Sequence, residues 1–218
     1  MRALLAGLTI ALAAGSFAGR SQEAHVRLFP PESLGLLEGP DRDDWQQPDR
    51  VMDSLGIADG ARVADLGAGG GWFTVRLAQR VGPNGMVYAE DIQPQMLESI
   101  RRRVRREGLS NVETVLGTPT DPRLPPGLSA VLIVDVYPQL SDPVAVLRRV
   151  REVLAPGGRL GIIDFKTDGE GGPGPPIENR LNPDVIVRNA ADAGLHLLRQ
   201  ETYLRFQYLL VFVSRSAD

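Results

Sequence analysis

The amino-acid sequence predicts an α/β fold with a doubly wound, mostly parallel sheet and helices on both faces. From residue 61 onward, short apolar runs typical of strands alternate with amphipathic segments typical of helices. The run 130–135 is apolar up to its last residue, Asp135, as expected for a central strand that is buried on both faces. The chain has 218 residues, 43% of them hydrophobic and 23% charged, which is ordinary for one globular domain.

Strands and helices alternate in a regular order. Seven segments have strand character: 62–66, 86–90, 112–116, 130–135, 159–164, 196–201 and 206–213. Five segments are predicted helices: 47–55, 72–81, 94–107, 142–154 and 183–193. Proline stands near the start of four of these helices, where its missing N–H costs nothing, and Asn182 is expected to cap the last. Segments 118–129 and 167–178 are predicted loops, and 156–158 a turn.

Composition excludes several classes of site. The chain has no cysteine, which excludes disulfides, thiolate zinc sites and a cysteine nucleophile. His25 and His196 are the only histidines, so we expect no metal site. The net charge of −3 provides no global basic field, so we expect no nucleic-acid partner.

The N-terminus has the layout of a secretory signal peptide. Arg2 precedes the apolar run 3–14, and Ser16-Phe17-Ala18 fits a cleavage site. We therefore interpret residues 1–22 as a signal peptide, which predicts an exported or periplasmic protein. An uncleaved N-terminal anchor, touching the membrane only through 3–19, and a mis-assigned start are the alternatives, and these predict a membrane-anchored or cytoplasmic protein.

A polar segment connects this N-terminus to the domain. Residues 23–46 are rich in Pro, Gly and Asp and are predicted to form an extended lead-in. The domain itself is predicted to span 47–218.

A glycine-rich turn follows the first predicted strand. Between Asp65 and Gly71 the chain reads DLGAGGG, which allows a sharp bend and close approach of a ligand. The helix that starts near Trp72 adds free N–H groups. Glu90 and Asp91 end the second strand, where a carboxylate can accept hydrogen bonds from both hydroxyls of a ribose. These features predict a site for a nucleoside-containing ligand.

Two residues discriminate between a dinucleotide and S-adenosylmethionine as the ligand. A dinucleotide fingerprint requires glycine at the sixth position counted from Gly67, where this chain has Trp72. Asp65 would repel a pyrophosphate but suits a cationic amino acid group. S-adenosylmethionine has an ammonium, a sulfonium, a ribose and an adenine, so the sequence favours it over a nicotinamide dinucleotide.

Three segments in this order resemble class I S-adenosylmethionine-dependent methyltransferases with a type 11/25-like domain. They are VADLGAGGG (63–71), VYAEDIQPQML (87–97) and LAPGGRLGIIDFK (154–166). The resemblance implies a Rossmann-like seven-stranded sheet, S-adenosyl-L-methionine as cofactor, and methyl transfer to an unidentified small-molecule acceptor. It covers about half of the chain.

The resemblance assigns the turn to the methionine part of the cofactor. It implies contacts from Gly67, Ala68, Gly69 and Gly71, with Asp65 near the amino group. The alternative interpretation is purely structural: the glycines form only a tight turn, and Asp65 is a structural cap.

The resemblance assigns the second and third strands to the nucleoside. It implies that Asp91 binds the ribose hydroxyls and that Ile92 packs on the adenine. We prefer Asp91 to Glu90 because the family's acid directly precedes an apolar residue. Gly117 and Thr118 take the place where relatives often have an aspartate near the adenine amine.

The resemblance implies that the end of the fourth strand faces the methyl group. Asp135 is implied both as a cofactor contact and, with Tyr137, as a candidate catalytic residue. A hydroxyl acceptor requires a general base, for which Asp164 is a further candidate, whereas a thiol or an arsenical does not. Relatives often have histidine after the tyrosine, and this chain has Pro138. The alternative interpretations are a hydrogen bond from Asp135 to a neighbouring loop and a core position for Tyr137.

Three functions are compatible with these features. The favoured one is an S-adenosylmethionine-dependent methyltransferase. The second is a non-catalytic, S-adenosylmethionine-binding envelope protein, because an exported enzyme faces the problem of obtaining a cofactor that is made in the cytoplasm. The third is a nucleotide-dependent oxidoreductase, which Trp72 disfavours. The sequence sets neither the acceptor atom nor the oligomeric state.

Overall fold

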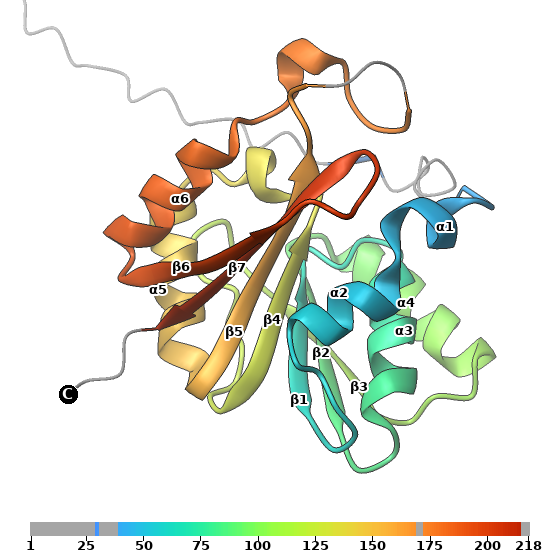
Figure 1. Ribbon diagram of the computed structural model, residues 1–218. Coiled ribbons are helices and arrows are strands. Elements are labelled where there is room, and N and C mark those ends of the chain that lie inside the picture. The colour runs from blue at the N-terminus through green and yellow to red at the C-terminus, as the bar shows by residue number, and fades with distance from the viewer. Residues whose placement is uncertain (1–28, 31–38, 169–171, 215–218) are drawn as a thin grey trace, which may run out of the picture.

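A computed structural model describes residues 29–30, 39–168 and 172–214 of the chain. Its strands are β1 (Arg62–Leu66), β2 (Met86–Asp91), β3 (Val112–Leu116), β4 (Leu128–Val134), β5 (Leu154–Phe165), β6 (Leu195–Glu201) and β7 (Gln207–Ser214). They form one seven-stranded sheet in the order β3-β2-β1-β4-β5-β7-β6, with helices on both faces (Figure 1). The predicted α/β, Rossmann-like architecture is therefore confirmed.

The helices fall where the sequence predicts them, with one addition. They are α1 (Arg42–Gln46), α2 (Pro48–Ser54), α3 (Trp72–Val81), α4 (Pro94–Arg106), α5 (Pro143–Val153) and α6 (Pro183–Asp192), with short 3-10 turns η2 (Tyr137–Gln139) and η3 (Ile177–Asn179). The Asp142 side chain caps α5 by accepting from the Ala145 N–H, and Asn182 caps α6 by accepting from the Asp184 N–H.

The sheet is mixed. Its four pairings from β3 through β5 are parallel, whereas β7 is antiparallel to both β5 and β6. Strands β6 and β7 follow each other with only residues 202–206 between them. A parallel pairing needs a crossover of a dozen or more residues, so a connection this short makes the pair antiparallel.

The core lies on both sides of the sheet. On one side, Leu147 of α5 and Ile186 of α6 pack with strand residues that include Val131. On the other side, Leu77 of α3 packs with residues that include Leu132, and α2 contributes to the same cluster. Strand β4 thus buries side chains on both faces, as its apolar run predicts.

The structure corrects the predicted lead-in. Residues 42–46 form helix α1 and are not extended. So short a helix gains its stability from tertiary contacts more than from propensity, and Asp43 of α1 pairs with Arg76 of α3. The predicted signal peptide and most of the lead-in lie outside the described residues. Of the helices that are described, none is long and apolar enough to cross a membrane.

The predicted turn at 156–158 is part of strand β5. Leu154 pairs with Leu128, and the register then shifts so that Arg159 pairs with Ala130. Gly157 has a φ of +76°, which fits an irregularity of this kind. The strand therefore begins before the turn residues and bulges at them.

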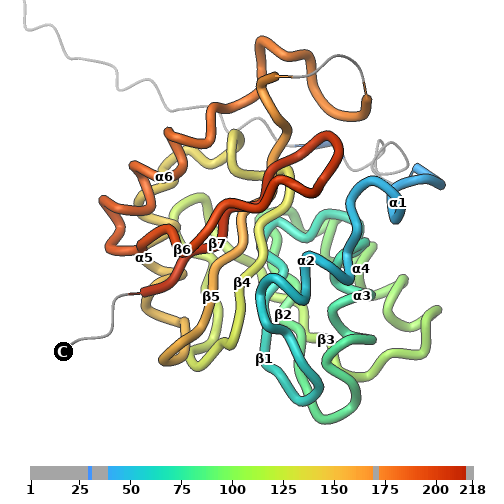
Figure 2. Tube along the Cα trace, in the orientation of Figure 1, coloured from blue at the N-terminus to red at the C-terminus, as the bar shows by residue number. Residues whose placement is uncertain are grey.

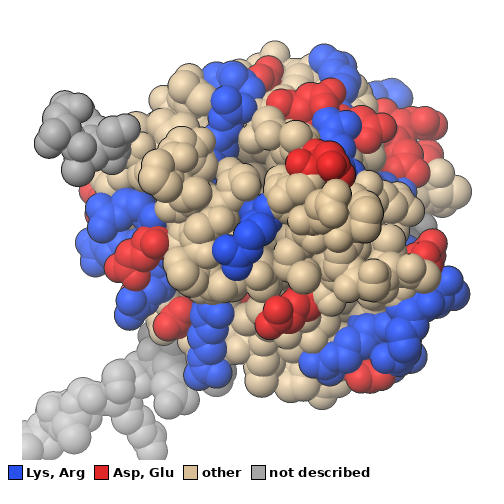
Figure 3. All heavy atoms as spheres, turned by 90° about the horizontal axis from the view of Figure 1, so that it is seen from below, with Lys and Arg blue, Asp and Glu red and all other residues tan. Residues whose placement is uncertain are grey.

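Helix α4 exposes an arginine-rich face. Guanidinium nitrogens of Arg101, Arg102 and Arg105 lie 3.7, 3.6 and 3.9 Å from the Glu98 carboxylate. Basic and acidic side chains share the face of the molecule seen from below (Figure 3). Exposed ion pairs of this kind contribute little to stability, so we do not expect the arginine-rich face of α4 to stabilise the fold.

The topology creates one switch in strand order. After β1 the chain runs outward through β2 and β3, and it then returns to place β4 on the other side of β1 (Figure 2). Ligands of open α/β sheets bind at such a switch, outside the carboxyl ends of the strands. This edge of the sheet therefore positions the candidate site.

Candidate functional site

A cavity opens at the carboxyl ends of β1, β2 and β4. It gathers most of the predicted cofactor residues from four separate segments: Asp65, Gly67, Ala68, Gly69, Asp91, Ile92, Thr118 and Asp135. Residues that the sequence analysis did not assign also line it, among them Phe29, Arg42, Trp72 and Glu90. The fold thus brings the glycine turn, the acids after β2 and the end of β4 to one place.

The glycine turn is held against the end of β2. Gly67 has a φ of +70°, and a Cβ there would lie 2.6 Å from Cγ2 of Val136. The Gly67 N–H donates to Oε2 of Glu90 at 3.2 Å, and the Gly69 N–H donates to Oδ2 of Asp91 at 3.0 Å. Glycine is therefore required at position 67 by both backbone conformation and space.

Asp91 is fixed by two backbone donors. Its Oδ2 accepts from Gly69 and its Oδ1 accepts from the Gln93 N–H at 2.9 Å. Burial raises the pKa of Asp91, and these two N–H groups lower it. Each carboxylate oxygen has a second lone pair, so the held carboxylate can still accept hydrogen bonds from a ligand.

Asp65 is buried beside the turn. Its Oδ2 accepts from the Thr74 hydroxyl at 2.6 Å. Burial raises the pKa of Asp65 to about 6, against the lowering effects of Thr74 and of the Arg42 guanidinium. Asp65 therefore connects β1 to α3 through its hydrogen bond with Thr74, and it also lines the cavity.

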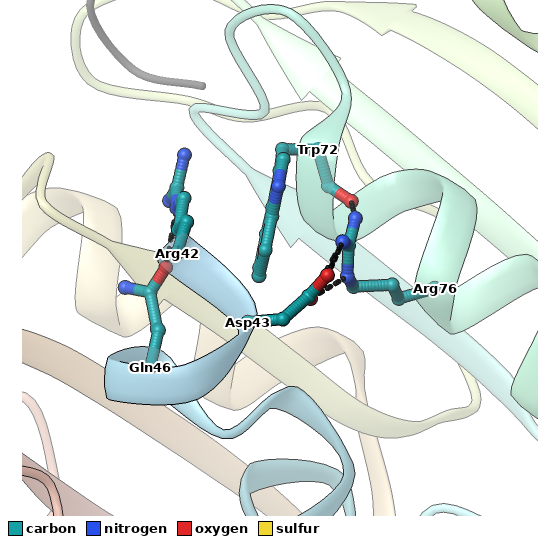
Figure 4. A network of polar contacts seen from close by, with 5 residues as sticks. All are labelled: Arg42, Asp43, Gln46, Trp72 and Arg76. Atoms are coloured by element: carbon teal, nitrogen blue, oxygen red, sulfur yellow. Dashed lines mark hydrogen bonds and ion pairs between the residues drawn. The ribbon is translucent and has the colours of Figure 1, made fainter. Parts of the chain in front are cut away.

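A stacked arrangement involving Trp72 joins α1 to the site. The indole stands between the guanidinium groups of Arg42 and Arg76 (Figure 4), whose carbons lie 4.2 and 3.5 Å from the ring centroid. Arg76 also donates two hydrogen bonds to Oδ1 and one to Oδ2 of Asp43. The sequence did not identify Arg42 as a site residue. Its one sequence signal is the spacing of four residues to Gln46, which places both side chains on one helix face.

Asp135, which follows β4 and lines the cavity, is held by a buried relay of hydrogen-bonded side chains. Gln207 donates from Nε2 to Oδ1 of Asp135 at 2.5 Å and accepts at Oε1 from Nε2 of Gln46 at 2.8 Å. Gln46 in turn accepts from Nε of Arg42 at 2.6 Å. Asp135 has a φ of +58°, rare for a residue with a side chain. Side chains from α1, β7 and the end of β4 therefore orient this carboxyl group.

The electrostatics around Asp135 favour its neutral form. Burial and the nearby Asp164 raise the pKa of Asp135 to about 7, although Arg42, Gln46 and Gln207 act in the opposite direction. Burial also raises the pKa of Asp164 to about 6. Oδ2 of Asp164 is buried without a hydrogen-bond partner in the part of the chain that the structure describes. A carboxyl group with a pKa near neutrality suits proton transfer.

Three predicted site residues do not line the cavity. A Cβ on Gly71 would lie 3.2 Å from Cγ1 of Ile100, and a Cβ on Gly117 would meet the Glu90 carboxyl group. The absence of a side chain at both positions therefore leaves room for Ile100 and Glu90 to pack there. Tyr137 is buried, and its hydroxyl accepts from Nδ2 of Asn189 at 3.1 Å. The roles assigned to these three residues from the resemblance therefore stay predictions, because their contacts in this structure are with packed protein groups.

Removing Gln207 is expected to destabilise the fold. Gln207→Leu leaves Nε2 of Gln46 and Oδ1 of Asp135 without this partner, and a buried polar group that loses its partner costs about 1–3 kcal/mol. We expect urea denaturation to show a loss of about 2–4 kcal/mol. Gln200→Leu on the neighbouring strand is the control, because Gln200 is exposed. Equal unfolding midpoints for the two variants would contradict the relay.

Comparison with known proteins places this geometry in a family. A profile described as "Methyltransferase domain" matches residues 63–158. The structure of a SAM-dependent methyltransferase from Aquifex aeolicus superposes with a TM-score of 0.80 at 27% identity, covering 85% of this chain and 98% of that one. Residues 63–158 of this chain therefore form a methyltransferase domain similar to those of class I methyltransferases. The resemblance seen in the sequence is thereby confirmed.

Other members of the methyltransferase family differ in what they methylate. The chain is 34% identical over 117 residues to the ubiquinone/menaquinone biosynthesis C-methyltransferase UbiE of Pasteurella multocida, covering 53% of this chain and 44% of that protein. It is 32% identical over 114 residues to the nocamycin O-methyltransferase of Saccharothrix syringae, covering 52% and 41%. The chain spans about half the length of the curated relatives it matches or less. Family membership therefore leaves the acceptor atom open.

Proposed function

We propose that this protein is an S-adenosylmethionine-dependent methyltransferase that acts on a small-molecule acceptor. The observation that carries the proposal is one cavity that is lined by Asp91, the glycine turn and Asp135. The names of two relatives, a ubiquinone/menaquinone biosynthesis C-methyltransferase and a nocamycin O-methyltransferase, support a small acceptor.

The residues around the cavity fit the cofactor. Asp91 would accept hydrogen bonds from the ribose hydroxyls, and Ile92 would contact the adenine. The bend at Gly67, which leaves no room for a Cβ, would cradle the methionine part. Arg42 and Asp65 line the same cavity and suit the carboxylate and the ammonium of an amino acid group.

Asp135 is the proposed proton acceptor for a hydroxyl substrate. When bound, S-adenosylmethionine supplies an electrophilic methyl group, so the chain itself needs no nucleophile. Its tasks are to position the acceptor and, where the acceptor is a hydroxyl, to take its proton. Gln207 and Gln46 hold the Asp135 carboxyl group for that purpose.

Ligand binding tests the proposal directly. The full chain is titrated by calorimetry with S-adenosylmethionine, S-adenosylhomocysteine and NAD. We expect the two sulfur ligands to bind and NAD not to bind, because Trp72 stands where a dinucleotide site needs glycine. Binding of NAD alone would favour the oxidoreductase alternative, and failure of both sulfur ligands rejects the proposal.

Transfer to small nucleophiles is expected to depend on pH. With methyl-labelled S-adenosylmethionine and a panel of phenols, amines and thiols, the rate for a hydroxyl acceptor should rise as pH increases through about 7, because Asp135 then loses its proton. Asp135→Asn should remove this rise and lower the rate about 100-fold or more. Transfer to thiols is the control and should lack this dependence on Asp135. Cofactor binding without transfer to any member of the panel would favour the non-catalytic alternative.

We also propose export for this protein, on the sequence of residues 1–22 alone. The apolar run behind Arg2 and the small residues that follow it are the support. Fractionation of cells that express the full chain, with a C-terminal tag, distinguishes a shortened periplasmic form from an anchored or cytoplasmic one. A full-length cytoplasmic product rejects export.

A further inference from the structure

Glu90 is a buried acid in the cavity for which the proposed reaction has no task. Its side chain is 2% exposed and lines the same cavity as Asp91. Oε2 accepts from the Gly67 N–H at 3.2 Å. On the other side, Oε1 occupies the space that a Cβ on Gly117 would need. The carboxyl group therefore sits between the glycine turn after β1 and the segment after β3.

Several acids surround this position. The charged side chains that act on Glu90 are Asp91 at the end of β2, Asp65 on β1 and Asp121 after β3, and all three are acidic. Ionised carboxylates this close in a buried site repel one another, so at least one is expected to hold a proton. Burial raises the pKa of Glu90 to about 8, with the Gly67 N–H acting in the opposite direction. Among these acids, Glu90 is therefore the one that we expect to be protonated most readily.

We propose that Glu90 binds the nucleoside part of the cofactor as a neutral acid that donates a hydrogen bond. The inference rests on the proposed function and adds a second nucleoside ligand beside Asp91. An ionised Asp91 can only accept hydrogen bonds, whereas a neutral Glu90 can donate. Ribose oxygens and adenine ring nitrogens are acceptors, so the two side chains together supply both kinds of partner.

The position of Glu90 favours the nucleoside over the methionine part. It directly precedes Asp91 and adjoins Gly117, and the segment after Gly117 lines the cavity through Thr118, Pro119 and Pro122. Arg42 and Asp65, which suit the amino acid group, belong to other elements, α1 and β1. Glu90 therefore lies between the segments assigned to ribose and adenine.

The proposal predicts that nucleoside affinity falls at alkaline pH. Below its folded-state pKa, Glu90 holds its proton and can donate; above it, the proton is lost and a second negative charge lies beside Asp91. The full chain is titrated with 5′-methylthioadenosine, a nucleoside without an amino acid group, between pH 6.5 and 9.5. We expect the Kd to rise about 10-fold from pH 7 to pH 9.5, as for the loss of one hydrogen bond.

Glu90→Gln separates ligand binding from a structural role. Its amide oxygen can still accept from Gly67 and its NH2 can donate, but the side chain does not ionise. We expect a Kd within about 3-fold of the native value at pH 7 and no rise up to pH 9.5. Asp121→Asn is the matched control, because it removes a neighbouring acid and should retain the rise.

The possible outcomes decide between the two claims. A constant Kd for the native protein, a rise that persists in Glu90→Gln, or a loss of more than about 10-fold in that variant at pH 7 each overturns the role of Glu90. Failure of the native protein to bind both S-adenosylhomocysteine and 5′-methylthioadenosine at any pH rejects the proposed function itself.

Discussion

Replacing Asp91 with alanine is expected to weaken the binding of S-adenosylhomocysteine by about 100-fold or more. The change removes the acceptors proposed for two ribose hydroxyls, and a hydrogen bond to a charged group contributes about 1.5–3 kcal/mol. Two such bonds amount to at least about 3 kcal/mol, where 1.4 kcal/mol is a factor of ten. The Gly69 N–H also loses its partner, which loosens the glycine turn. Calorimetric titration measures the loss.

Two further variants sharpen this result. Glu98→Ala removes an exposed acid from α4 and should leave the affinity unchanged, because Glu98 lies outside the cavity. Asp91→Asn keeps the shape but replaces one acceptor with a donor, so we expect a loss of at least about 10-fold. Affinity of Asp91→Ala within about 3-fold of the native protein would contradict the assignment of the ribose to Asp91.

Replacing Gly117 with alanine is expected to destabilise the fold by about 1–3 kcal/mol. A Cβ at this position would lie 1.8 Å from Oε1 of Glu90 and 3.3 Å from Cα of Pro122. The Glu90 carboxyl group must therefore move, and it then loses its hydrogen bond from Gly67. Urea denaturation measures the loss, and a displaced Glu90 should also weaken the binding of 5′-methylthioadenosine.

A double-mutant cycle attributes the cost to one contact. If the new Cβ collides with Glu90, then Gly117→Ala should cost little in a Glu90→Ala background, with a coupling energy of about 1–2 kcal/mol. Glu90→Ala alone provides the reference for the lost hydrogen bond. Additive effects of the two substitutions would show that Gly117 is required for another reason.

The local part of the fold followed from the sequence. Strand Arg62–Leu66 and helix Trp72–Val81 have the predicted bounds, and the helix predicted at 142–154 is α5 (Pro143–Val153), with Asp142 as its cap. Periodicity and capping act over a few residues, so a single segment carries the signal. The sequence also predicted the bend at Gly67, because a run of glycines after a strand favours a tight turn.

The direction in which a residue faces depends on more than one segment, and the sequence does not give it. The sequence placed Gly71, Gly117 and Tyr137 in the site through their position in a motif. In the structure Gly71 faces Ile100 and Tyr137 meets Asn189. A motif gives the place of a residue on the chain but not the direction of its side chain, which depends on the neighbours that pack there.

The sequence by itself thus determined the α/β architecture, the glycine turn and the acids that end β2. Only the tertiary structure decided that β7 runs antiparallel, that Arg42 enters the cavity, and that Gln46 and Gln207 hold Asp135. Gln46 and Gln207 are 161 residues apart in the chain. No periodicity or short motif encodes a contact at that separation, because it exists only once the sheet and α1 have packed together.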